Sequence, residues 1–78
     1  MKELIEYIAC SLVEDPTQVQ VTEYPGRNGI NIDLRVAKED MGRVIGRGGR
    51  VAEAMRTLLQ VAAVRLGKRA YLEIVEPR

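Results

Sequence analysis

Three glycines, at positions 46, 48 and 49, separate two segments that both show the apolar spacing of a helix. Glycine lacks a Cβ, so it suits a tight turn and lets another molecule approach the backbone closely. Arginines stand before, inside and after this break, at positions 43, 47 and 50. The segment Arg43–Val51 therefore predicts two helices joined by a basic loop that can contact an anion. The alternative is that Gly46 and Gly49 only allow the helices to turn tightly against each other.

The helix expected after the loop has no side chain suited to capping its start. No Ser, Thr, Asp or Asn occurs between positions 41 and 56, although these residues usually accept a hydrogen bond from the first backbone N–H groups of a helix. We therefore expect those N–H groups to lack internal partners at the positive end of the helix dipole. Such a helix start suits a phosphate.

The charge is divided unevenly along the chain. Residues 1–40 carry four basic and eight acidic side chains, a net charge of −4, whereas residues 41–69 carry seven basic side chains and only Glu53, a net charge of +6. The overall net charge of +1 hides this division. A concentration of positive charge in and behind the glycine loop favours a polyanionic partner, with a solvated basic helix face as the alternative.

Apolar spacing predicts the remaining elements. In chain order we expect a helix at 2–14, strands at 17–24 and 30–36 joined by a turn at 25–29, helices at 38–45 and from residue 50 to Gly67, and a strand at 70–75. The two strands that flank the helix pair should be parallel. The order α-β-β-α-α-β predicts an α+β fold, with a three-stranded mixed sheet, three helices packed on one face, and the opposite face partly open.

Two expectations concern side-chain burial. In the helix after the loop, one apolar stripe is expected to face the core: Val51, Ala54, Met55, Leu58, Ala62 and Leu66. Cys10, the only cysteine, is expected to be a small packed side chain in the first helix.

Length and composition exclude several classes. A chain of 78 residues has room for one domain, 1–78. Without histidine and with one cysteine it offers neither a disulfide nor a Cys/His zinc site. Cys10 and Ser11 have no evident base, and the glycine loop lacks the Lys-Ser/Thr ending of a P-loop, so we expect neither catalysis nor a cofactor. No apolar run approaches the roughly 20 residues that span a membrane, and we expect a cytoplasmic location.

The run Ile45-Gly46-Arg47-Gly48-Gly49 resembles the I-G-x-x-G signature of KH domains, whose loop between two helices clamps the backbone of about four single-stranded nucleotides. A helix and a strand before the β-α-α-β core are similar to the type II KH arrangement over the whole chain. The length, the run Asp40–Arg50 and the run Arg56–Leu59 resemble the KhpA family of small stand-alone bacterial KH proteins.

The resemblance implies a ligand in a narrow groove between the glycine loop with its two helices and the neighbouring sheet edge. Gly46 and Gly49 would let the nucleic-acid backbone come close, and Arg47 and Arg50 would meet phosphates. An apolar floor for bases would come from Val44, Ile45, Val51 and Ala54, with core packing as the competing role and, for Ala54, the favoured one. The implied RNA-binding residues are Arg43, Val44, Ile45, Gly46, Arg47, Gly48, Gly49, Arg50, Val51 and Ala54.

Two functions follow as hypotheses. The first is an RNA-binding protein that holds single-stranded RNA, in post-transcriptional regulation or as an RNA chaperone. The second is a protein-interaction module for which RNA is secondary, motivated by the small core and an open sheet face where Tyr24 or Tyr71 could be exposed. The resemblance implies a homodimer, or a heterodimer with a larger Jag-type (KhpB) RNA-binding protein. The three tyrosines lie outside the glycine loop, which argues against an aromatic stacking platform.

Overall fold

A computed structural model of the protein describes residues 1–76. Pro77 and Arg78, which belong to the predicted domain 1–78, lie outside the described residues. The elements are α1 (Lys2–Leu12), β1 (Gln20–Gly26), β2 (Gly29–Arg35), α2 (Met41–Ile45), α3 (Arg50–Arg65) and β3 (Ala70–Ile74), with 3₁₀ turns at Pro16–Gln18, Lys38–Asp40 and Arg47–Gly49. The predicted order α-β-β-α-α-β and the α+β class are confirmed.

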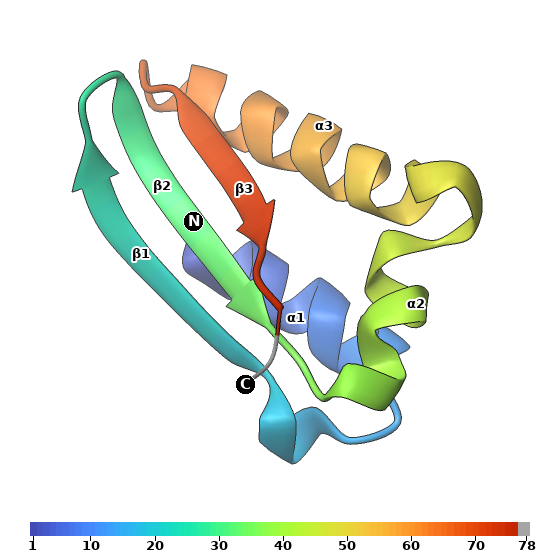
Figure 1. Ribbon diagram of the computed structural model, residues 1–78. Coiled ribbons are helices and arrows are strands. Elements are labelled where there is room, and N and C mark those ends of the chain that lie inside the picture. The colour runs from blue at the N-terminus through green and yellow to red at the C-terminus, as the bar shows by residue number, and fades with distance from the viewer. Residues whose placement is uncertain (77–78) are drawn as a thin grey trace.

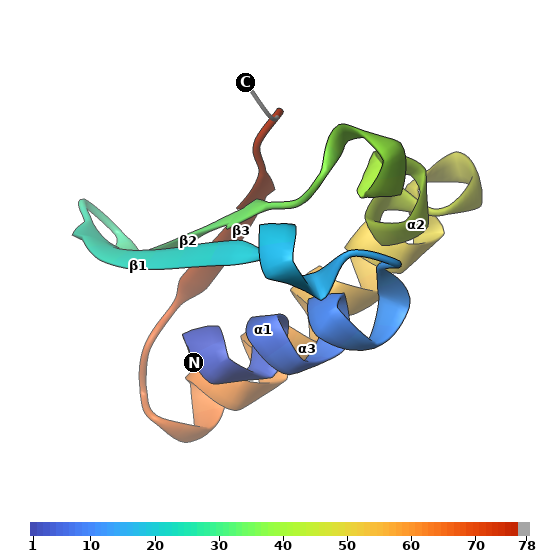
Figure 2. The same ribbon diagram turned by 90° about the horizontal axis from the view of Figure 1, so that it is seen from below.

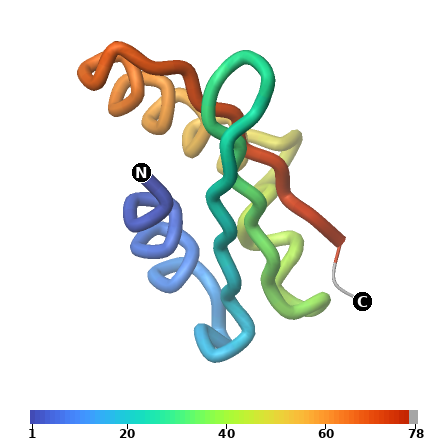
Figure 3. The backbone as a smooth tube through the Cα atoms, turned by 90° about the vertical axis from the view of Figure 1, so that its left-hand side faces the viewer, coloured from blue at the N-terminus to red at the C-terminus, as the bar shows by residue number. Residues whose placement is uncertain are grey.

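The sheet has the strand order β1-β2-β3 and is mixed, as predicted (Figure 1). β1 and β2 form an antiparallel hairpin, and β3 returns through α2 and α3 to lie parallel to β2. α1 and α3 lie against one face of the sheet, and α2 lies at the loop end of α3 (Figures 1 and 2). Seen from the side of β1, α1 runs alongside the hairpin (Figure 3). Each edge of the sheet is therefore one strand, β1 on one side and β3 on the other.

The hairpin differs from its predicted boundaries. The first strand begins at Gln20, because Asp15 accepts a hydrogen bond from the backbone N–H of Thr17 (3.2 Å) and caps a short 3₁₀ turn there. The strand then continues through Pro25, which pairs with Ile30. Proline has no N–H to donate and is tolerated because β1 is an edge strand.

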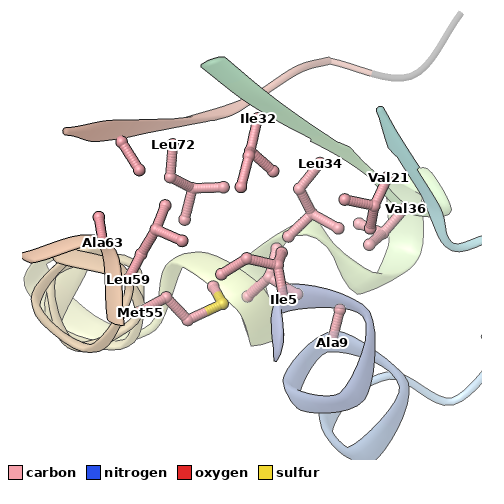
Figure 4. Close-up of a cluster of buried hydrophobic side chains, with 12 residues drawn as sticks. Ile5, Ala9, Val21, Ile32, Leu34, Val36, Met55, Leu59, Ala63 and Leu72 are labelled. Carbon is pink, nitrogen blue, oxygen red and sulfur yellow. The ribbon is translucent and has the colours of Figure 1, made fainter. Parts of the chain in front are cut away.

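The core lies between the sheet and the two long helices (Figure 4). Alternation in the strands predicted its sheet side, where Ile32 and Leu34 are fully buried. α1 contributes Ile5 and Ala9 from its inner face. Cys10, one residue further on, is exposed, so its predicted packing is wrong. A helix turns by about 100° per residue, which carries Cys10 away from the core once Ala9 faces it.

The buried face of α3 is not the predicted stripe. It consists of Ala52, Met55, Leu59 and Ala63, and only Met55 had been assigned to it. Leu58 and Leu66 are exposed at 51% and 61%. Apolar residues occur nearly all round this helix, so spacing alone does not define which side is inward. The observed phase buries three small or medium side chains beside Met55 and leaves an apolar outer face.

Candidate nucleic-acid interface

Gly46 ends α2 and is required by the fold. Its backbone has φ 76° and ψ 172°, a region that essentially only glycine adopts. A Cβ built at this position would lie 2.4 Å from Cγ2 of Val51 and 2.9 Å from its backbone nitrogen. The absence of a side chain at Gly46 therefore lets the start of α3 fold back against the end of α2.

Gly48 and Gly49 have a different setting. Both have positive φ, 63° and 79°, and a Cβ at either position would meet no atom within 4 Å. Together with Arg47 they form a 3₁₀ turn in which the N–H of Gly49 donates to the carbonyl of Gly46 (3.1 Å). These two glycines turn the chain into α3 and leave open space around the backbone.

The N–H groups at the start of this helical segment lie earlier in the chain than expected. No side chain caps α3, as predicted. The N–H of Arg50, however, donates to the carbonyl of Arg47, because the 3₁₀ turn runs directly into the helix. The first bond of the 3₁₀ turn runs from the N–H of Gly49 to the carbonyl of Gly46, so the N–H groups of Arg47 and Gly48 precede it and have no partner within the turn. The donors at the start of the turn are thus in the exposed loop itself.

The three predicted arginines divide into two kinds. Arg47 and Arg50 are exposed and form no ion pair within the described residues. Arg43 instead contacts Oε1 of Glu14 through Nη2 (2.7 Å) and Oδ1 of Asp40 through Nε (3.3 Å). Arg47 and Arg50 are therefore available to an anion, whereas Arg43 is already engaged by two carboxylates.

Asp40 is a residue of the site that the sequence did not reveal as such. The predicted helix 38–45 places Asp40 in a first turn, where a negative charge needs no partner, but its side chain is buried, with 3% exposure. Its two carboxylate oxygens accept hydrogen bonds from the N–H groups of Glu14 (3.0 Å) and Asp15 (3.2 Å). Asp40 thus ties the turn after α1 to the start of α2, and the partners are 26 and 25 residues away in the chain.

The predicted apolar floor is only partly at the surface. Val44 is fully buried in the core, so it supports the loop from below. Val51 is half-buried and lies under Gly46. Ile45 has 37% exposure, and Ala54 is exposed, contrary to the core role favoured for it. Ile45, Val51 and Ala54 are the members of this set that a bound molecule could contact.

The open sheet face differs in charge from the loop. Tyr24 and Tyr71 are exposed there, as predicted, at 40% and 42%. The hydroxyl of Tyr24 donates to Asp33 (3.2 Å), which pairs across the strands with Glu73. Desolvation and the carboxylate of Asp33 raise the pKa of Tyr24. Asp33 and Glu73 set two carboxylates against Arg35 on this face, which makes it a poorer site for a polyanion than the loop.

Other classes of site find no support in residues 1–76. That part of the chain contains no group of three or more His, Cys, Asp or Glu side chains placed to hold a metal ion. No helix there has the length and hydropathy needed to cross a bilayer.

The fold and the loop define a KH domain of type II: a β-α-α-β unit with a glycine loop between its helices and a helix and strand before it. A model of the KhpA/KhpB KH-domain family matches residues 2–74. The chain belongs to this family. It is a family of KH-domain proteins and not of enzymes, as predicted.

Curated relatives match along their whole length. The RNA-binding protein KhpA of Clostridium acetobutylicum is 52% identical over 96% of this chain and 100% of its own, and that of Clostridium perfringens is 48% identical over the same shares. The KhpA protein of Chlamydia trachomatis is 45% identical over the full length of both chains. The resemblance to the KhpA family is confirmed.

Solved structures agree with the fold. An Aquifex aeolicus Era variant and an Era complex with a segment of 16S ribosomal RNA each superpose with a TM-score of 0.64 at 23% identity. The superposition covers 96% of this chain and 29% of each Era chain. At this identity the likeness concerns the fold alone.

Proposed function

We propose that this protein binds single-stranded RNA at the loop Gly46–Arg50, with a GxxG clamp on the sugar-phosphate backbone. The observation that carries the proposal is that the two amides at the start of the 3₁₀ turn, those of Arg47 and Gly48, lie beside two guanidinium groups that form no ion pair within residues 1–76, those of Arg47 and Arg50. Curated relatives at 41–52% identity are named RNA-binding proteins. The whole chain, 1–78, would act as one KH domain.

The loop would hold phosphates rather than bases. Open space around Gly48 and Gly49 lets the nucleic-acid backbone approach the amides. Ile45, Val51 and Ala54 would lie under the adjacent bases. With about two to four phosphate contacts, the logarithm of the binding constant should fall against the logarithm of salt concentration with a slope of about −1.5 to −3.

The test replaces Arg47 and Gly48 together by Asp and measures affinity for a fluorescent oligouridine by anisotropy. Gly48 has the left-handed backbone that Asp tolerates, so the variant should stay folded, which circular dichroism checks. The matched control places the same charge change in the hairpin turn, as Arg27→Asp with Asn28→Asp. We expect at least tenfold weaker binding for the loop variant and a much smaller change for the control. Equal weakening in both would show that only net charge matters and would refute the clamp.

A second candidate function is pairing with another copy of the chain through the outer face of α3. Leu58, Val61 and Val64 are exposed there at 51%, 53% and 71%, beside Leu66 at the end of the helix. Exposed apolar side chains in one row are typical of a contact surface. A twofold axis would bury the same row from both copies. Pairing would bring two glycine loops into one particle and raise avidity for RNA.

The pairing proposal is tested by sedimentation over a dilution series from 1 to 100 μM, roughly the range in which interfaces of this kind dissociate. We expect a dimer that Val61→Asp converts to a monomer with unchanged circular dichroism. A wild-type monomer throughout would exclude the homodimer. Mixing with a KhpB-type protein would then test the heterodimer, the other pairing that the family implies.

We further propose a cytoplasmic role in post-transcriptional regulation or as an RNA chaperone. Crosslinking in cells followed by sequencing of the bound RNA tests this role. The loop variant that combines Arg47→Asp with Gly48→Asp is the control. If the wild type enriched no transcript above the level found with this variant, the role would be contradicted.

A further inference from the structure

The outer edge of β3 is lined by backbone groups of alternate residues. Among residues 1–76, β2 is the one strand that pairs with β3, so β3 is an edge strand. The carbonyl of Arg69 and the N–H of Val75 point toward β2, since they bond to Ile30 (2.9 Å) and Leu34 (2.8 Å). Backbone groups alternate along a strand in a parallel ladder, so those of Ala70, Leu72 and Ile74 point outward. An exposed row of this kind can bond to a ligand or another strand.

Two side chains of α3 reach this outer edge. Nε2 of Gln60 donates to the carbonyl of Ala70, and Nε of Arg56 donates to the carbonyl of Leu72 (3.3 Å). Four residues of helix rise by about 6 Å and two residues of strand by about 6.6 Å, so the helix and the strand stay in step. The same step places Ala52 level with Ile74. An alanine methyl group has no hydrogen-bond donor and is too short to bridge to the carbonyl of Ile74.

The edge of β3 is thus covered at one end and open at the other. Gln60 and Arg56 bridge α3 to β3 over Ala70 and Leu72. α3 and β3 diverge from there toward the glycine loop (Figure 1). Arg56 is therefore the last bridging side chain before the uncovered stretch at Ile74, between the sheet edge and the loop.

The guanidinium of Arg56 is oriented but not saturated. Its Nε–H is held by the carbonyl of Leu72, and Nη1 lies 3.5 Å from Oε1 of Glu53, which is itself 75% exposed. Within residues 1–76, Nη2 has no recorded partner. The side chain is 44% exposed. A fixed Nε places the two terminal nitrogens, Nη1 beside the exposed carboxylate of Glu53 and Nη2 beyond it, as two parallel donors at a defined place.

We propose that Arg56 recognises one base of the bound strand by donating both terminal N–H groups to two adjacent acceptor atoms. Guanine offers O6 and N7, and cytosine offers O2 and N3. Uracil and adenine place a donor beside the acceptor on the corresponding edges, so they satisfy only one of the two nitrogens. This inference rests on the proposed RNA binding and adds base preference to a loop that contacts only phosphates.

A purely structural role for Arg56 makes a different prediction. If the side chain only covers the edge of β3, its replacement should change stability or weaken all RNAs equally. A base-recognising arginine should affect the preference among bases and leave the salt slope unchanged, since the phosphate contacts stay in place. The two roles are separated by the base dependence of affinity.

The experiment measures the affinity of the full chain for uridine heptamers, either unmodified or carrying one central guanosine, cytidine or adenosine. The variant Arg56→Gln keeps a donor that can reach the carbonyl of Leu72, as Gln60 does at Ala70. Arg56→Lys keeps the charge without the parallel donors. Arg65→Gln, in the exposed last turn of α3, is the control for loss of one positive charge.

We expect the wild type to bind the guanosine or the cytidine heptamer about five- to tenfold more tightly than the uridine heptamer, within the range of a two-donor arginine contact. Both Arg56 variants should reduce that preference to less than twofold with an unchanged salt slope, and Arg65→Gln should retain it. A wild type that binds all four heptamers equally, or an Arg56→Gln variant that weakens all four by the same factor, overturns the inference while RNA binding stands. Failure of the wild type to bind any heptamer overturns the proposed function as well.

Discussion

The glycine segment has two halves that differ in how the fold treats them. In the first half, from Asp40 to Gly46, three positions are fixed by the rest of the fold: the carboxylate of Asp40 by two amides, Val44 by the core, and Gly46 by Val51. In the second half, from Arg47 to Gly49, a Cβ at either Gly48 or Gly49 would meet no atom within 4 Å. The first half, which we call the foundation, is packed against the rest of the fold. The second half is an exposed loop whose position the foundation fixes. Binding residues are commonly found on loops that a rigid scaffold positions in this way.

The comparison shows that glycine can be needed at two positions of one motif for different physical reasons. Gly46 is required because a side chain would collide with Val51 inside the fold. A side chain at Gly48 would meet no atom within 4 Å, so under the proposed function its absence would serve access for a ligand. Substitutions in the first half should therefore lower stability, and substitutions in the second half should lower affinity in a protein that remains folded.

The largest effect is expected for Gly46→Ala. The backbone at φ 76° and ψ 172° costs a residue with a Cβ about 1–3 kcal/mol, and the contact of 2.4 Å with Val51 adds to it. We expect a loss of about 3 kcal/mol in the free energy of unfolding, measured by urea denaturation. The double variant Gly46→Ala with Val51→Ala should regain part of the stability lost through the collision. It should regain none of the stability lost through backbone strain. A single variant as stable as the wild type would contradict the packing described for Gly46.

A smaller loss is expected for Asp40→Ala. It removes the acceptor of two backbone N–H groups and one partner of Arg43. Part-buried donors left without acceptors cost about 1–3 kcal/mol, so we expect a loss near 2 kcal/mol. Asp40→Asn keeps one acceptor oxygen and should lose about half as much. Hydrogen exchange at Glu14 and Asp15 should speed up in both variants, and unchanged exchange would show that Asp40 does not hold this turn.

Arg43 and Arg47 allow the two halves to be compared with one kind of substitution. Arg47→Ala should weaken RNA binding by about three- to fivefold and make the salt slope less steep by about 0.7, as expected for one phosphate contact to a single strand. Arg43→Ala should change affinity by less than twofold, because its guanidinium is already bonded to Glu14 and Asp40. It should instead lower stability by up to about 1 kcal/mol. Equal effects of both variants on affinity would place Arg43 among the RNA contacts after all.

The sequence predicted those parts of the molecule in which one local pattern has one physical meaning. Alternation in β2 coincides with burial of Ile32 and Leu34, and the glycine run coincides with positive φ at three positions. The phase of α3 was missed because Ala52 and Leu59 face inward while equally apolar neighbours such as Leu58 face outward. Which side is buried depends on how the loop aims the helix at the sheet, and no spacing within the helix contains that information.

The anchoring role of Asp40 was missed for another reason. Its partners are backbone amides of residues 14 and 15, which any sequence possesses, so their positions in the chain give no signal. A negative charge near a helix start has a sufficient local explanation in the helix dipole, so the sequence does not point to a further partner. The bridge of Arg56 to the carbonyl of Leu72 is hidden in the same way. Hydrogen bonds between a side chain and backbone groups far away in the chain can be found only from the three-dimensional structure.

The smallest effect tests whether position in the segment decides the sign of one substitution. Gly42 lies inside α2 with an ordinary helical backbone and open space around its Cα. Gly42→Ala should raise the free energy of unfolding by about 0.5–1 kcal/mol, because alanine loses less backbone entropy in a helix. Gly49→Ala also meets open space but has φ 79°, so it should lower the free energy of unfolding by about 1 kcal/mol. Urea denaturation of both variants measures the two changes in the free energy of unfolding. If both changes had the same sign, the backbone conformation at these glycines would not distinguish the foundation from the loop.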